Sequence, residues 1–264
     1  MAYLRKLALA GAAALALAPS LARAADMPVA PLPAPVEFGG WYLRGDIGIT
    51  NQVVGKLDSP AFTSDVSVLQ KSFDSAGSFG IGIGYQFNSW LRTDFTGEYR
   101  AKANFNGLDY VSTGPQTNQY RGDKSEWLFL WNVYADLGTW NNITPFVGAG
   151  IGFDQLTISN FTDTNLGAPA LGVSNGDSSK WNFAWALYAG AAYHVTPTFS
   201  IELSYRYVNL GDGTTKDLTF AGGGNAGYNP IQFKNVYSND IRLGVRWMFA
   251  DTFAPAPEPL YRKY

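Results

Sequence analysis

Apolar and polar residues alternate one by one along eight separate stretches of the chain. Between residues 40 and 50, for example, Trp41, Leu43 and Ile47 fall on one side, and Arg44 and Asp46 fall on the other. A period of two residues is the pattern of a β-strand with two different faces. The stretches lie within residues 41–50, 78–87, 91–100, 126–137, 144–154, 182–194, 199–207 and 240–249. The pattern predicts eight strands and no long helix.

The spacing of these stretches indicates how the strands are arranged. Each is about ten residues long or more, which is the length of a tilted strand that crosses a bilayer. Tight turns at 88–90, 138–142 and 196–198 alternate with long segments near 51–77, 103–123, 155–180 and 210–236. Short turns on one side and long loops on the other are typical of bacterial outer-membrane barrels.

The backbone has to satisfy its own hydrogen bonds in lipid, and a sheet does so only when it closes. We therefore predict an all-β fold, an eight-stranded antiparallel up-and-down transmembrane β-barrel with short periplasmic turns and long extracellular loops.

The polar side of the strands carries full charges, which we place in the barrel lumen. An eight-stranded barrel is only wide enough for its own side chains, so these charges need partners. The predicted lumen charge network is Arg44, Asp46, Arg92, Asp94, Glu98, Arg100, Asp136, Glu202, Arg206, Arg242 and Arg246. We expect inward-facing glycines of residues 80–84 and 148–152 to make room for the neighbouring side chains. The favoured role is a structural polar core. A narrow path for ions or small solutes stays open as the alternative.

The first residues have the pattern of a secretory signal peptide. A basic start and an apolar run from Leu7 to Ala18 are followed by Ala22 and Ala24, which provide a small-x-small cleavage site. We predict a signal peptide at 1–24, a Pro-rich periplasmic leader at 25–39, the outer-membrane barrel at 40–249 and a Pro-rich periplasmic tail at 250–264.

Composition limits the chemistry. Charged residues make up 15% of the chain and its net charge is −2, with no basic stripe, so no nucleic-acid partner is expected. Cysteine is absent, which excludes disulfides and thiolate sites. With a single histidine we expect no metal site and no cofactor. His194 falls at the periplasmic end of a predicted strand, away from surface lipid A. We therefore predict no enzyme, with a lipid A-modifying enzyme as a distant alternative.

The closing strand carries an assembly pattern. Arg242, Gly244, Trp247 and Phe249 place a polar residue, a glycine and two aromatics at fixed spacing, similar to the β-signal read by the outer-membrane assembly machinery. Phe249 is not the last residue, which departs from the usual pattern. The expected partners are this machinery, periplasmic chaperones, outer-membrane lipid and lipopolysaccharide, and the barrel is expected to be a monomer.

Together the motifs resemble the alphaproteobacterial porin-like outer-membrane β-barrel family, the small surface proteins of rhizobia and brucellae. The resemblance is carried by residues 24–28, 40–48, 144–152 and 204–211 and by the closing strand. It implies a fold like the OmpA transmembrane domain and an outer-membrane location. It also implies a structural and surface role in envelope integrity and in contact with the host or environment.

Overall fold

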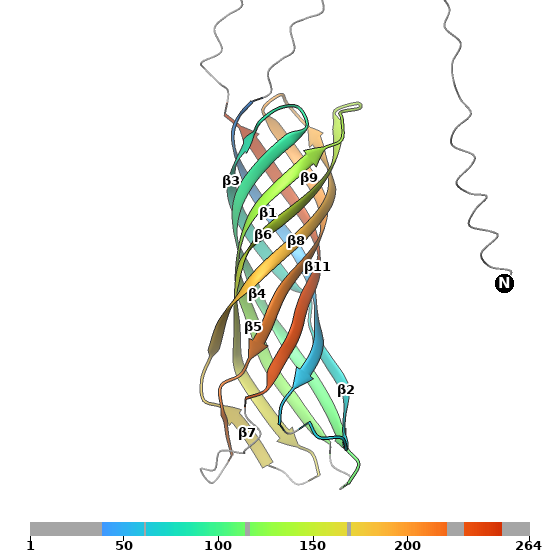
Figure 1. The fold of residues 1–264 in the computed structure, drawn as a ribbon, viewed down its shortest axis with the longest axis vertical. Coiled ribbons are helices and arrows are strands. Elements are labelled where there is room, and N and C mark those ends of the chain that lie inside the picture. The colour runs from blue at the N-terminus through green and yellow to red at the C-terminus, as the bar shows by residue number, and fades with distance from the viewer. Residues whose placement is uncertain (1–38, 61, 114–116, 168–169, 221–229, 250–264) are drawn as a thin grey trace, which may run out of the picture. The chain divides into compact units, whose positions relative to one another are not determined.

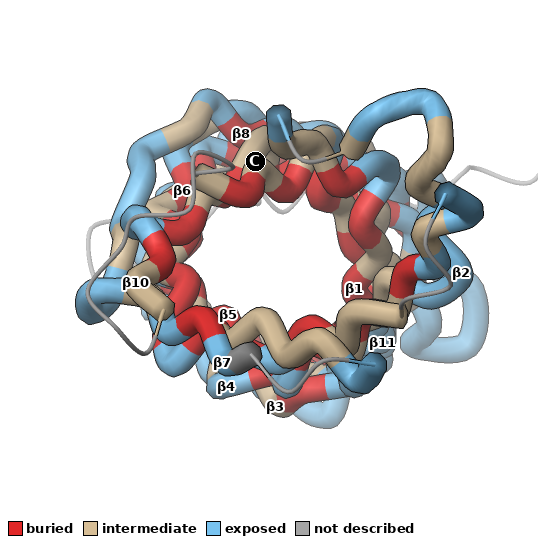
Figure 2. Tube along the Cα trace, turned by 90° about the horizontal axis from the view of Figure 1, so that it is seen from below, coloured by how far each residue is buried: buried red, intermediate tan, exposed pale blue. Residues whose placement is uncertain are grey.

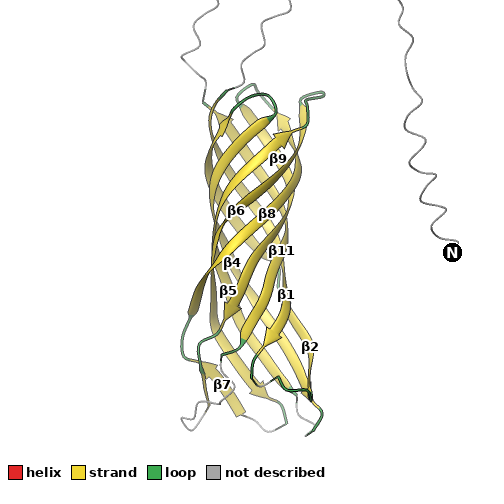
Figure 3. Cartoon of the chain, viewed as in Figure 1, coloured by secondary structure: helices red, strands yellow, loops and turns green. Residues whose placement is uncertain are grey.

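The computed structural model describes residues 39–60, 62–113, 117–167, 170–220 and 230–249, and in these residues the chain is built of strands and turns (Figure 3). Eight strands form a closed antiparallel ring (Figure 1). They are β1 (Gly40–Asp58), β3 (Ala76–Gln86), β4 (Leu91–Val111), β5 (Asn118–Asp136), β6 (Ile143–Asn165), β8 (Ser178–His194), β9 (Phe199–Thr214) and β11 (Gln232–Met248). The ring closes where β1 pairs with β11, from Tyr42 opposite Met248 to Asp58 opposite Gln232. The prediction of an eight-stranded antiparallel barrel is confirmed.

The signal peptide with Ala22 and Ala24, the leader up to residue 38, and the tail after Phe249 lie outside the described residues. Among the residues that are described, no helix is long and apolar enough to span a membrane.

The two ends of the barrel differ. Tight turns of four to six residues, at 87–90, 137–142 and 195–198, join strands at one end, as predicted. At the other end the wall continues, with three short strands, β2 (Val66–Phe73), β7 (Ala170–Ser174) and β10 (Leu218–Phe220), paired to β4, to β6 and to β7 respectively. We call the described residues of 54–73, 102–123, 156–177 and 210–236 the outer extension. The prediction of long loops near 51–77, 103–123, 155–180 and 210–236 is wrong for most of the residues described there, which form strands around a packed interior.

The outward face of the barrel is apolar between two aromatic belts. Near the turns, Trp41, Trp90, Trp140 and Trp247 are exposed, and near the outer extension Trp127 and Trp181 are exposed. This is the girdle arrangement of membrane barrels. Seen along the axis, buried positions line the inside of the ring (Figure 2). The apolar side of the strands therefore faces lipid, and the charged side faces the lumen.

Inward-facing positions change parity where the wall leaves the membrane. In β4, Glu98 and Arg100 face inward, and after a β-bulge Ala103 and Phe105 do so. Asn160 in β6 and Asn235 in β11 adopt left-handed backbone angles, with φ of 51° and 52°, at the corresponding irregularities. A bulge adds one residue to a strand and so moves the following side chains to the other face. Above the bulges apolar residues face in and polar residues face water.

The interior of the outer extension is a layer of packed rings that we call the aromatic plug. Its members are Phe73, Phe105, Tyr120, Phe161 and Phe233, all buried. Ring centroids are 4.9 Å apart for Phe105 and Phe233, and 5.2 Å apart for Phe73 and Phe105. Aliphatic side chains of the same cluster, including Val54, Leu57, Leu156 and Ile158, complete the layer. The extension therefore has a hydrophobic core of its own.

Candidate functional site

The structure places all eleven residues of the predicted lumen charge network on the inner face of the wall, where each is buried. They come from β1, β4, β5, β9 and β11, and ion pairs link them into one connected cluster. The alternation turns these side chains inward. The lumen is narrow enough for side chains from non-neighbouring strands to meet across it.

Glu202 is the centre of the half of the cluster that lies nearer the turns. Its carboxylate lies 3.1 Å from Arg246 Nε, 3.3 Å from Arg92 Nη1 and 3.5 Å from Arg44 Nη2. Arg44 also binds Asp94 at 2.7 Å. One carboxylate on β9 therefore holds guanidinium groups from β1, β4 and β11 against one another.

Arg206 and Arg100 organise the other half. Arg206 Nη2 lies 2.5 Å from Glu98 Oε1 and 2.7 Å from Asp240 Oδ2. Arg100 reaches the same Asp240 at 3.1 Å and Glu126 Oε2 at 2.8 Å. Buried charges are tolerated only when they are paired in this way.

The prediction missed three members of the cluster. Lys124, Glu126 and Asp240 are fully buried and join it through Arg100 and through a Lys124–Glu126 pair. Asp240 is an even number of positions from Arg242 on the same strand, and so is Glu126 from Asp136. The alternation could therefore have identified Asp240 and Glu126 as facing the lumen. With them, the described residues of the cluster are seven basic and seven acidic side chains, and their charges balance.

The prediction of the charge network also missed Asp154, which is not a member of the ion pairs described above. Its carboxylate is buried, and neither oxygen has a hydrogen-bond partner among the described residues. No three acidic, histidine or cysteine side chains in the described ranges are grouped so as to hold a metal ion.

Aromatic rings support the cluster at its turn-side end. The Arg92 guanidinium lies 4.3 Å from the ring centre of Tyr134 and 4.7 Å from that of Phe146. Tyr134 Oη accepts a hydrogen bond of 3.0 Å from Arg44, and Tyr188 Oη donates one of 2.8 Å to Asn132. Cation–π contacts of this kind are strongest where water is excluded.

Inward-facing glycines give this crowded lumen its space. A Cβ at Gly84 would lie 2.3 Å from the Tyr42 ring, and one at Gly148 would lie 2.4 Å from the Tyr134 ring. A Cβ at Gly82 would lie 3.0 Å from Arg44. The expectation that glycines make room for neighbouring side chains is confirmed at these positions.

The lumen is therefore closed by two successive layers. The charge cluster fills the membrane-spanning part, and the aromatic plug covers it on the side of the outer extension. Lys124 connects them, since its Nζ lies 5.1 Å from the ring centre of Phe73. An ion on this path would have to displace paired charges and then cross an apolar layer, which carries a high desolvation cost.

His194 lies at the turn end of β8, on the side opposite the outer extension. Its Nδ1 is 2.9 Å from Ser200 Oγ and its Nε2 is 2.8 Å from Thr144 Oγ1. Both ring nitrogens are thus engaged by hydroxyl groups at the periplasmic edge, as expected for a satisfied interfacial histidine.

Three residues of the predicted assembly signal lie on β11, and Phe249 directly follows this strand. Trp247 and Phe249 are exposed on the outer face, and Arg242 is buried in the lumen. Gly244 lies beside Asp46, whose Oδ1 would be 2.5 Å from an added Cβ. The aromatic residues are thus accessible on the lipid side of the strand, and their role in assembly stays a prediction.

The chain is similar to known proteins in sequence and in structure. The model of a family described as "Outer membrane protein beta-barrel domain" matches residues 7–249. An uncharacterized protein of Brucella abortus is 32% identical over 267 residues, covering 87% of this chain and 93% of that protein. A "Putative adhesin" of Rickettsia bellii is 30% identical over 222 residues, covering 78% and 87%. The outer membrane protein OprG of Pseudomonas aeruginosa has a similar structure, with 13% identity, coverage of 81% and 98%, and a TM-score of 0.49.

Proposed function

Because the chain belongs to the outer membrane protein beta-barrel domain family, we propose that it is a structural outer-membrane protein whose outer extension makes contacts with the host or environment. The observation that carries this proposal is the outer extension itself. Its strands continue past the membrane belt around a packed aromatic plug, which gives a rigid platform in place of flexible loops. The adhesin name of the Rickettsia relative supports a role in contact.

The tips of this platform carry apolar side chains that no lipid covers. Leu69 on β2, Leu166 at the end of β6, and Leu171 on β7 are exposed, and so is Tyr110 on β4. Apolar groups exposed to water on an otherwise polar surface often mark interaction sites. We place the contact surface at these tips.

An adhesion assay tests the proposal. Bacteria without adhesins of their own express the chain and are counted on host-cell monolayers. The combined variant Leu69→Ser, Leu166→Ser and Leu171→Ser should lower attachment several-fold. Asn104→Ser, at an exposed polar position in the wall of the extension, should not. Attachment that stays at the wild-type level in the triple variant, with normal surface expression, would contradict the proposal.

The role as a channel is the weaker alternative, because both layers of the lumen would have to open. Planar-bilayer recordings of the refolded protein should show no steady conductance, and Glu202→Ala should leave this unchanged. Open-channel steps in the wild type that change in size with Glu202→Ala would favour the channel.

We also propose that the protein is not an enzyme. Its histidine lies at the turn end of the barrel, away from the outer leaflet, with both nitrogens bound to Ser200 and Thr144. Lipid A from cells with and without the chain should give the same mass spectrum. A change in acylation that His194→Ala abolishes would overturn this part of the proposal.

A further inference from the structure

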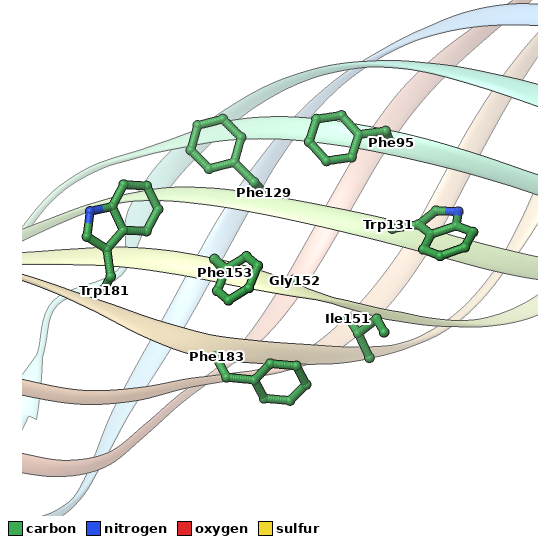
Figure 4. A pocket seen from close by; sticks show the side chains of 8 residues that line it. All are labelled: Phe95, Phe129, Trp131, Ile151, Gly152, Phe153, Trp181 and Phe183. Carbon is green, nitrogen blue, oxygen red and sulfur yellow. The ribbon is translucent and has the colours of Figure 1, made fainter.

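The outer surface of the wall is hollowed in two different ways. Apolar grooves of about 640 Å³ and 530 Å³ lie on its lipid-facing part, where membrane hydrocarbon covers them. Figure 4 shows the side chains that line the larger groove, which are Phe95, Phe129, Trp131, Ile151, Gly152, Phe153, Trp181 and Phe183. A smaller hollow, of about 300 Å³, lies on the outer extension and is lined mainly by polar residues. Small-molecule sites begin at about this size.

We call this smaller site the polar hollow. Strand pairing gathers its residues on one patch of the wall. Asn104 on β4 is paired with Asp123 on β5, and Asn106 is paired with Arg121. Asp74, directly after β2, donates its backbone N–H to the Asn104 carbonyl oxygen at 2.9 Å. The lining residues are Asp74, Asn104, Phe105, Asn106, Arg121, Gly122, Asp123 and Asn160.

Amide groups on two sides of the polar hollow hold its carboxylates in place. The pairing of β5 with β6 is irregular between Arg121 and Asp123, and Asn160 lies at this irregularity with φ of 51°. Asn160 Nδ2 donates a hydrogen bond of 2.8 Å to Asp123 Oδ2. On the other side, Asn104 Nδ2 donates one of 3.1 Å to Asp74 Oδ2. The orientation of both carboxylates is therefore set before a ligand binds.

The polar hollow keeps hydrogen-bonding capacity for a ligand. Among the described residues, no donor binds Oδ1 of Asp74 or Oδ1 of Asp123. Arg121 is exposed and has no ion-pair partner in the part of the chain that the structure describes. A carboxylate accepts hydrogen bonds, a guanidinium donates them, and an asparagine amide does both. Acceptors and donors therefore surround the same space.

The charges around the polar hollow limit the class of ligand. Asp74 and Asp123 are negative. Arg121 is positive, and so is Lys102, whose Nζ lies 3.8 Å from Asp123 Oδ2. The cations disfavour a bare metal ion, and the carboxylates disfavour a phosphate or sulfate. An uncharged molecule with several hydroxyls matches both kinds of group, because a hydroxyl donates to a carboxylate and accepts from a guanidinium or an amide.

The polar hollow lies where sugars border the membrane. On β5, Asp123 is four residues from Trp127 of the outer aromatic belt. At about 3.3 Å per residue this is about 13 Å along a tilted strand, beyond the hydrocarbon. Glycolipids of the outer leaflet carry their sugars at this height, and a glycan of another cell offers the same chemistry. The hollow opens on the side of the extension and not at its tips, which favours the leaflet's own sugars.

We propose that the polar hollow binds an uncharged pyranose. Asp74 and Asp123 accept hydrogen bonds from adjacent ring hydroxyls, while Arg121 and the Asn106 amide donate to the hydroxyl oxygens. The inference goes beyond the proposed function, because the site is separate from the tips. It rests only on the outer-membrane location of the barrel.

Titration with methyl glycosides tests the proposal. The mature chain is refolded in phosphatidylcholine nanodiscs, and NMR follows the side-chain amide resonances of Asn104, Asn106 and Asn160. Methyl glucoside, methyl galactoside and methyl mannoside are added in turn, and at least one of them should shift these resonances in a saturable way. Calcium chloride and sodium sulfate should not do so.

Variants with matched controls locate the binding. Arg121→Ala should weaken it about tenfold, as expected when hydrogen bonds from a charged group are lost. Asp123→Asn should weaken it as well. Lys180→Ala and Asp58→Asn, which remove exposed charges elsewhere on the outer extension, should keep wild-type affinity. The heat-dependent gel shift of every variant reports that the barrel is folded.

A second experiment separates the two sources of sugar. Nanodiscs with rough-type lipopolysaccharide, which carries core sugars, are compared with nanodiscs that contain lipid A alone. Core sugars in the hollow should compete with the glycoside only in the former, and Arg121→Ala should then attach to host cells normally. A glycan of another cell predicts no such competition and weaker attachment of Arg121→Ala.

Two results would overturn the proposal. One is the absence of a saturable shift with all three glycosides and with rough-type lipopolysaccharide. The other is an equal loss of affinity in the variants and their controls. The triple leucine variant of the tips should bind the glycoside normally, so failure of this proposal and failure of the proposed adhesion are separate results.

Discussion

Replacing Arg206 with methionine should lower the free energy of unfolding by about 3 kcal/mol. Arg206 is buried and binds Glu98 at 2.5 Å and Asp240 at 2.7 Å. Breaking a buried pair typically costs about 3–5 kcal/mol, because a desolvated charge is left behind. We expect the lower end of this range, because each carboxylate retains a second arginine partner. Glu98 still has Arg242 at 3.4 Å, and Asp240 still has Arg100 at 3.1 Å. Methionine preserves most of the aliphatic volume and so limits any cavity.

Urea unfolding of the barrel in phosphatidylcholine vesicles, followed by the gel shift, measures this loss. Lys56→Met is the control, because Lys56 and Asp58 form an exposed pair 3.0 Å apart with side chains 68% and 44% accessible. Exposed pairs contribute about 1 kcal/mol or less. Adding Asp240→Asn to Arg206→Met removes the excess negative charge and should recover about 1 kcal/mol. The reasoning is refuted if Arg206→Met costs no more than Lys56→Met, since the lumen would then be solvated.

Two further predictions concern the wall and the outer extension. Gly152→Ala should prevent refolding, because the added Cβ would lie 1.9 Å from the Phe129 carbonyl oxygen. Gly77→Ala should refold normally, because no atom would lie closer than 3.7 Å to its added Cβ. The gel shift after dilution from urea checks both variants. Burial and then the charge of Asp109 raise the pKa of Asp163 to about 6. Because the pKa of Asp163 is raised in the folded state, the folded protein loses stability as pH rises from about 4 through 6. Asp163→Asn should therefore stabilise the extension at pH 8 and not at pH 4. Hydrogen exchange of the β6 amides at the two pH values measures this, and an equal effect at both would contradict it.

The membrane-spanning part could be predicted because lipid imposes a simple rule on the sequence. Apolar side chains face out and charged ones face in, so the parity of Arg44, Asp94 or Glu202 is enough to place each of them in the lumen. The strict requirement for closed hydrogen bonding then sets the topology. Partners across the lumen were not predictable, since which arginine meets Glu202 depends on the tilt and stagger of the strands.

The outer extension was missed for the opposite reason. There the rule inverts: Ala103 and Phe105 face inward, and Lys102 and Asn104 face water. The bulge that causes the inversion interrupts the alternation at the border, and the remaining polar residues then read as a loop. The left-handed Asn160 was a usable signal, because asparagine tolerates that backbone conformation better than most residues.

The row of bulges has a consequence for how this protein can change over generations. An insertion or deletion beyond a bulge alters the pairing of the distal strands, but the irregularity absorbs the offset before it reaches the bilayer. The part of the wall beyond the bilayer is thereby free to diversify in length and sequence, while the membrane-spanning part keeps its alignment.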